Sequence, residues 1–204
     1  MDTNISIESA FSDGWAIFKA HMGSAIGAVF LALLIGSLTC GICIPPLMCG
    51  VFMLADCWLT KRNPAAGAGS VFDGFQVFLP SFCAALLLNL GLYILCAVLM
   101  IVPIVGPLAS MAVSVIGAPL SVWVLVIVAN RRIPCMKALG FVLDATFHGK
   151  FWMPILVGFL ANLVGAAGSF VCGIGLLFTL PLAYCIYAAA YRQMFPVEEV
   201  EVVD

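Results

Sequence analysis

The stretch FSDGWAIF (Phe11–Phe18) is echoed about sixty residues later by VFDGFQVF (Val71–Phe78), and each stands directly before a long apolar run. Both contain an Asp-Gly pair followed by an aromatic residue. In the first stretch, apolar and polar side chains occupy opposite faces of a helix, which is typical of a helix lying flat at a membrane surface. We therefore expect each stretch to form a short interfacial helix that introduces membrane-spanning segments.

Composition places the chain in a membrane. Of its 204 residues, 64% are hydrophobic and 9% are charged, whereas about a quarter of the residues in ordinary soluble domains are charged. Three runs lack Asp, Glu, Lys and Arg, and each exceeds the roughly 20 residues that cross a bilayer. They are Met22–Ala55, Gly74–Asn130 and Phe151–Tyr191. The amino-terminal residues show no cleavable signal pattern, so we expect the first span to be an uncleaved anchor.

Proline and glycine divide each run into two helices, because irregular backbone is kept out of lipid. The breaks are CGICIPPLMCG, IVPIVGPLAS and VCGIGLL. They predict an all-α integral membrane protein with six transmembrane helices in three hairpins, each preceded by a short interfacial amphipathic helix. Pro119 and Pro181 are expected to kink the second arms of the last two hairpins. The expected spans are 22–42, 46–60, a helix ending near 101, 110–130, 151–172 and 176–191.

The basic residues predict the orientation. All eight Lys and Arg residues fall before or after a hairpin, and none falls in the turn that joins its two arms. Under the positive-inside rule, this side of the membrane and both termini are cytoplasmic. Trp15, Trp58, Trp152 and Tyr191 are expected to form an aromatic belt at the same boundary.

Three units of similar plan follow one another in what we expect to be a single transmembrane domain, 1–195. The pseudo-repeats cover about 5–62, 67–132 and 134–192, and an acidic cytoplasmic tail occupies 196–204. Each unit has one Asp in its interfacial segment, two spans with a Pro-Leu step in the second, and a basic end.

The three interfacial acids are Asp13, Asp73 and Asp144. We expect them to face water or to pair with a basic end such as Arg62 or Arg132, because charges at interfaces are ordinary. The alternative is a ring of carboxylates around a central cytoplasmic vestibule. Gly14 and Gly74 are expected to permit a bend of the chain.

Asp56 is the one acid inside a predicted span, and it lies about 7 to 8 Å along the helix from Lys61. We expect Lys61 or Arg62 to approach it in a structural role. The alternative is that Asp56 belongs to an ion or proton path, as buried acids in membranes often do.

Asn89 and Asn162 lie near the middle of the third and fifth helices. An amide at that depth needs a partner, most simply the other amide or a neighbouring helix, so we interpret both as contacts between helices. A substrate contact is the alternative.

Cys40-Gly-Ile-Cys43 has the spacing of a redox or metal pair, and Cys172 lies on the same predicted side. A closed zinc site takes four ligands, and neither His21 nor His148 is expected there. We favour packing, while an oxidising compartment would permit an outer-face disulfide.

No nucleophile elbow, phosphate-binding loop or paired-carboxylate site is visible, so we predict no enzyme activity, no catalytic residues and no cofactor. The formal net charge of −2 includes no basic patch, which argues against a nucleic acid partner.

The motifs FDGF and TLPLAYCIYAAAYRQMF, set in this layout, resemble a broad group of bacterial six-span membrane proteins. That group is similar to the membrane domain of some glycerophosphoryl diester phosphodiesterases. These 204 residues include no recognisable phosphodiesterase domain, so we expect no hydrolase activity to carry over. The resemblance implies a location in the bacterial inner membrane and a lipid-related or accessory role.

Three functional hypotheses follow. The first is a non-enzymatic accessory or scaffold subunit, or a lipid-interacting module, whose partners are the lipid bilayer and other membrane protein subunits. The alternative is a small transporter or channel for an ion, lipid or small solute, with Asp56, Asn89 and Asn162 along its path. A weaker third hypothesis is redox activity of Cys40 and Cys43.

Overall fold

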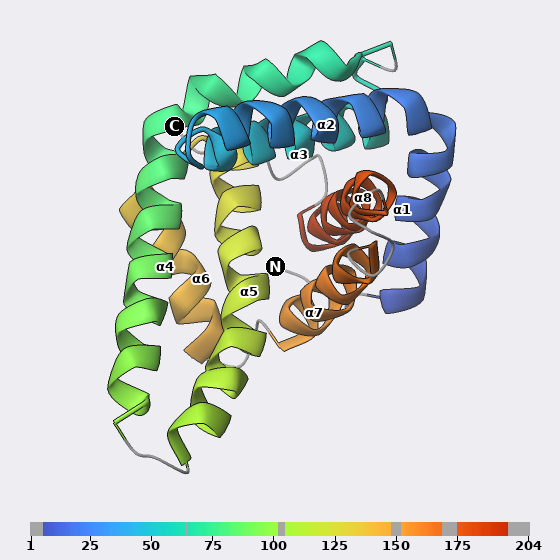
Figure 1. Ribbon diagram of the computed structural model, residues 1–204. Coiled ribbons are helices and arrows are strands. Elements are labelled where there is room, and N and C mark those ends of the chain that lie inside the picture. The colour runs from blue at the N-terminus through green and yellow to red at the C-terminus, as the bar shows by residue number, and fades with distance from the viewer. Residues whose placement is uncertain (1–5, 64, 102–104, 148–151, 169–174, 196–204) are drawn as a thin grey trace.

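A computed structural model describes residues 6–63, 65–101, 105–147, 152–168 and 175–195. All regular secondary structure in these residues is helical, which confirms the predicted all-α class (Figure 1). The helices, in chain order, are α1 (Ile7–Ala20), α2 (Met22–Leu38), α3 (Ile44–Leu59), the 3-10 helix η1 (Ala68–Val77), α4 (Phe78–Leu99), α5 (Val105–Arg131), α6 (Cys135–Phe147), α7 (Trp152–Ala167) and α8 (Leu176–Met194).

Two helical segments in the described residues are long and apolar enough to cross a membrane. They are Ala68–Leu99, which joins η1 to α4, and Val105–Arg131, which is α5. The pair α1 and α2 makes a third if it is counted as one span, although the two helices meet at 92°. α3 and α7 are apolar but shorter, at 16 residues each. The chain thus has two to three candidate membrane spans by length and composition.

The turn between α2 and α3 shows how local sequence sets these boundaries. Cys40 and Gly41 have φ values of 49° and 87°, and the Gly41 N–H donates to the Gly36 carbonyl at 2.8 Å. This left-handed turn ends α2 in the manner of a glycine cap. Pro45 and Pro46 then lie in the first turn of α3, where an amide N–H has no partner within the helix.

Each short helix packs against a helix outside its own hairpin. α1 lies along α8, η1 lies along α3, and α6 contacts α4 and α5. In α1, Ala10, Gly14 and Phe18 are buried, while Asp13 and Lys19 on the other faces are exposed. The apolar faces that predicted interfacial helices are therefore covered largely by protein, and the short helices join one hairpin to another.

α3, α5 and α8 contribute most of the core. The Trp123 ring lies 5.3 Å from the Tyr187 ring, in an edge-to-face arrangement. Trp123 Nε1 donates to the Pro154 carbonyl, and the Tyr187 hydroxyl donates to the Gly158 carbonyl, both at 2.8 Å. A Cβ atom on Gly158 would lie 2.9 Å from each donor atom, so the glycine allows α7 to receive both bonds.

The predicted aromatic belt is wrong in two of its four members. Trp15 and Trp152 are 47% and 67% exposed, as a belt requires. Trp58 and Tyr191, however, are 6% and 0% exposed. Position near a helix end places a side chain at the right depth, but the helix face decides whether it points outward, and these two point into the bundle.

Candidate functional site

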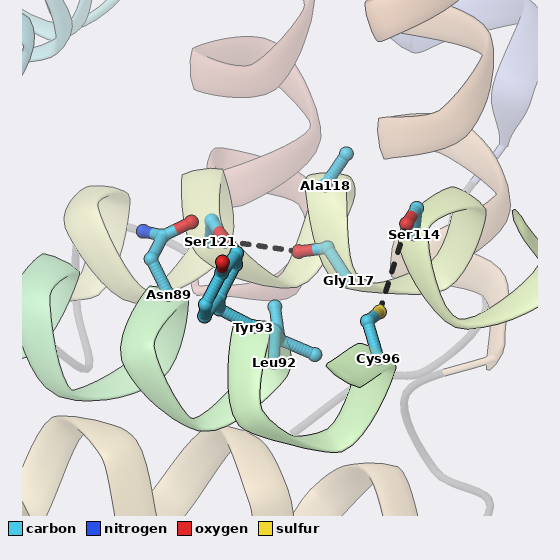
Figure 2. A pocket seen from close by; sticks show the side chains of 8 residues that line it. All are labelled: Asn89, Leu92, Tyr93, Cys96, Ser114, Gly117, Ala118 and Ser121. Atoms are coloured by element: carbon cyan, nitrogen blue, oxygen red, sulfur yellow. Dashed lines mark hydrogen bonds between the residues drawn. The ribbon is translucent and has the colours of Figure 1, made fainter. Parts of the chain in front are cut away.

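A groove with several polar side chains in its walls lies between α4 and α5, which run side by side and extend beyond the remaining helices (Figure 1). The groove has a volume of about 340 Å³. Figure 2 shows side chains from both helices at its walls. The lining residues are Asn89, Leu92, Tyr93, Cys96, Ser114, Gly117, Ala118 and Ser121.

Helical spacing and small residues form this groove. Asn89, Tyr93 and Cys96 recur at intervals of four and three residues, so they share one face of α4. On α5, a Cβ atom at Gly117 would lie 2.7 Å from Leu92 Cδ1, so the missing side chain permits close contact there. Next to this contact, the α5 side of the groove is recessed, because the side chain of Ala118 is only a methyl group.

The groove lies near the middle of α4. This helix has 22 residues and is about 33 Å long, and Asn89 lies about 16 Å from its first residue. Tyr93, one turn further along, is 73% exposed, and Asn89 is also exposed. If α4 spans a bilayer, both polar side chains lie close to the depth at which hydrogen-bonding groups are scarcest.

Only part of the hydrogen-bonding capacity of these side chains is used. Asn89 Nδ2 donates to the Ala85 carbonyl at 2.8 Å, and Ser121 Oγ donates to the Gly117 carbonyl at 3.0 Å. Within the described residues, the Asn89 side-chain oxygen accepts no hydrogen bond. The groove therefore offers an open acceptor, the second amide hydrogen and the Tyr93 hydroxyl to an incoming polar group.

Asn162 is a residue of α7, and it lies near α5 but lines a different cavity from Asn89. It lines a cavity of about 190 Å³ that includes Pro119 and Phe159, and its side chain interacts with Tyr187 of α8. The simplest expectation, a pair between Asn89 and Asn162, is wrong, because the two amides face different neighbours. Asn162 is a contact from α7 to α8, as the neighbouring-helix alternative predicted.

Asp56 forms a buried ion pair with Arg192. Arg192 Nε donates to one carboxylate oxygen of Asp56 and Nη2 donates to the other, in a two-point contact between α3 and α8. The side chains of Asp56 and Arg192 are 9% and 12% exposed. The expected partners, Lys61 and Arg62, are wrong: α3 ends before them, and both side chains are exposed.

Asp13, Asp73 and Asp144 are all exposed, while the residue after each is buried. In η1, a Cβ atom on Gly74 would lie 1.9 Å from the Pro46 carbonyl oxygen, and in α1 one on Gly14 would lie 2.9 Å from Ile186 Cα. The glycines expected to bend the chain instead allow close contact with α3 and α8. The sequence carried this signal in the Asp-Gly pair, but not the identity of the helix approached.

The cysteine motif forms no site in the described residues. Cys40 is exposed, Cys43 is half-buried, and both are free thiols. Cys172 and His148 lie outside the described residues. Among the side chains that the structure describes, no group of three or more His, Cys, Asp or Glu residues is placed to hold a metal ion.

Comparison with known proteins supplies no relative. No protein-family model, curated protein or solved structure matches the chain.

Proposed function

We propose that this protein is a non-enzymatic, multi-span membrane module that acts as an accessory or scaffold subunit. Its α4–α5 groove binds a transmembrane helix of another membrane protein subunit. The observation that carries the proposal is the position of Asn89 and Tyr93, exposed at mid-helix and beside Ser121 across the groove.

The proposal includes six spans: α2, α3, α4, α5, α7 and α8. The right angle between α1 and α2 supports it, since a helix lying at the membrane surface meets a spanning helix at about this angle. α3 and α7 are about 24 Å long, and a bilayer accommodates short spans by thinning at modest cost. The distribution of basic residues favours cytoplasmic termini, and the bacterial inner membrane is proposed from the sequence resemblance alone.

The exposure of α4 supports a partner helix at this face. In the most apolar window of Ala68–Leu99 only 11% of the residues are buried, against 44% for α5. An apolar exposed surface is stable in lipid, but polar groups in hydrocarbon gain from hydrogen bonds to another helix. The groove thus favours a helix that carries a polar side chain at the same depth.

The transporter alternative has weaker support. Its proposed path joins Asp56, Asn89 and Asn162, but Asn89 and Asn162 line different cavities. Both carboxylate oxygens of Asp56 are already held by Arg192. Pro119 inside α5 and Pro181 inside α8 are features typical of transporter helices, and Pro119 lies beside Asn162.

Site-specific photo-crosslinking in living cells tests the proposal. A photoreactive phenylalanine analogue replaces Tyr93 in one variant and Phe30 in a control variant. Phe30 is 50% exposed on α2, so it samples lipid outside the groove. We expect a discrete protein adduct from position 93 at several times the yield from position 30.

The Asn89→Leu change in the position-93 variant links this adduct to the groove. A hydrogen bond between membrane helices contributes about 0.6 kcal/mol on average, so we expect the adduct yield to fall about threefold. Mass spectrometry of the adduct identifies the partner, and a second copy of this chain is one outcome. Equal lipid adducts from both positions would show that the groove binds no helix.

A further inference from the structure

A second cavity lies where α1 turns into α2, far in sequence from the α4–α5 groove. Its volume is about 380 Å³. It is an open hollow lined by residues of α1, the connecting His21 and the end of α3. They are Ala16, Ile17, Ala20, His21, Trp58 and Lys61.

An aromatic stack holds one side of this cavity in place. The His21 and Trp58 rings lie 4.6 Å apart and are nearly parallel, at 6°. Trp58 is buried, and its Nε1 donates to the Ala66 carbonyl at 3.2 Å. The facing wall is recessed because Ala16 and Ala20, one turn apart on α1, have short side chains. The ring stack and the Trp58 hydrogen bond therefore fix the position of this wall of the cavity.

The cavity combines an apolar wall with unused polar groups. Lys61 follows the end of α3, is exposed and forms no ion pair among the residues described. The His21 ring likewise makes no hydrogen bond within the described residues. Ile17, Ala16 and Ala20 offer only apolar surface. A ligand that fits has an anionic group for Lys61 and His21 and an attached hydrocarbon chain for the wall of α1.

We propose that this cavity binds the headgroup of an anionic phospholipid, with the phosphate at Lys61 and His21 and the first part of an acyl chain against Ala16, Ile17 and Ala20 of α1. The inference depends on the proposed membrane placement but not on the α4–α5 groove. Lys61 lies at the end of an apolar helix, at the depth of headgroups in that placement. A soluble phosphate ester would meet the same cation but would leave the apolar wall uncovered.

Native mass spectrometry of the full chain in detergent, titrated with phosphatidylglycerol or phosphatidylcholine, tests the site. A basic residue near a membrane surface contributes about 1 kcal/mol to anionic lipid binding, which is about fivefold in affinity. We expect one phosphatidylglycerol to bind at least about fivefold more tightly than phosphatidylcholine. Lys61→Gln should remove this preference, because it deletes the charge at an exposed position that does not support the fold.

Two further variants make the assignment specific. Lys137→Gln removes an exposed lysine on α6, outside the cavity, and should leave the lipid preference unchanged. Ala20→Leu fills the recessed wall and should weaken both lipids, because the acyl chain loses its place. Equal binding of the two lipids, or an equal effect of Lys137→Gln and Lys61→Gln, would overturn the proposal. Displacement of the lipid by millimolar glycerol 3-phosphate would instead assign the site to soluble phosphate esters.

Discussion

Replacing Asp56 with leucine is expected to lower the free energy of unfolding by about 3–5 kcal/mol, the usual cost of breaking a buried ion pair by removing one partner. The Arg192 side chain would remain 88% covered in the wild-type geometry, since it is 12% exposed, but without the carboxylate that accepts two of its hydrogen bonds. One guanidinium nitrogen, Nη1, already has no partner among the described residues. Titration with SDS in mixed micelles, followed by circular dichroism, measures the change.

A double variant separates the charge from the packing. Asp56→Leu combined with Arg192→Met removes both charges, and replacing a buried pair by apolar residues is often neutral or stabilising. We therefore expect the double variant to recover most of the stability lost in Asp56→Leu. Asp73→Leu removes an exposed acid and serves as the matched control, with no loss expected. If the double variant is no more stable than Asp56→Leu, the ion pair is not the source of the loss.

The partner of Asp56 illustrates what the sequence leaves undetermined. An acid inside an apolar run predicts a compensating cation, and that much is confirmed by the ion pair. The nearest cations in sequence, Lys61 and Arg62, were the expected partners. Arg192 lies 136 residues from Asp56, and only the packing of α3 against α8 brings the two together. Local spacing carries no information about such contacts.

Helix boundaries were more predictable because their causes are local. In IVPIVGPLAS, Pro107 lies in the first turn of α5, and the prolines of CGICIPPLMCG lie in the first turn of α3. A proline lacks an amide N–H and a glycine permits positive φ, so each acts on its own few residues. These local signals mark where α3 and α7 begin and end, but they do not establish that the two helices span a membrane. Each has 16 residues, fewer than the roughly 20 that cross a bilayer.

Of the residues that line the α4–α5 groove, the sequence singled out Asn89 and none of the others. Asn89 is conspicuous in the sequence because an amide interrupts a leucine-rich run. Tyr93, four residues later, shares its helix face, so the spacing contained a further signal. Ser121 had no such signal, because its place beside Asn89 depends on the register of α5 against α4. Sequence periodicity gives the face of one helix but not its alignment with the next.

The Asp-Gly pairs have an explanation that composition did not suggest. In η1 the Asp73 side chain is exposed, while Gly74 is buried against α3. Gly50 of α3 faces the same crossing, where a Cβ atom would lie 1.9 Å from the Val71 carbonyl oxygen. The two helices thus meet backbone to backbone. The acid is exposed on one face of the short helix, and the glycine lets the opposite face approach its neighbour.

Replacing Gly74 with alanine is therefore expected to destabilise the fold by about 3 kcal/mol or more, at or above the upper end of the usual cost of overpacking. The added Cβ atom would lie 1.9 Å from the Pro46 carbonyl oxygen and 2.5 Å from the Gly50 nitrogen. Both are backbone atoms, so no side-chain rotation relieves the overlap, and η1 must move away from α3. The loss is measured by the same SDS titration and by a lower thermal midpoint in detergent.

Gly69→Ala is the matched control, because Gly69 lies in the same 3-10 helix and a Cβ atom there has nothing within 4 Å. Alanine restricts the unfolded chain more than glycine, so this variant should be neutral or slightly more stable than wild type. The contrast between positions 69 and 74 isolates the close approach from any general effect of replacing glycine in this segment. Equal stability of the two variants would mean that η1 and α3 are not in backbone contact. The Asp-Gly pairs would then need another explanation, such as the bend first expected of them.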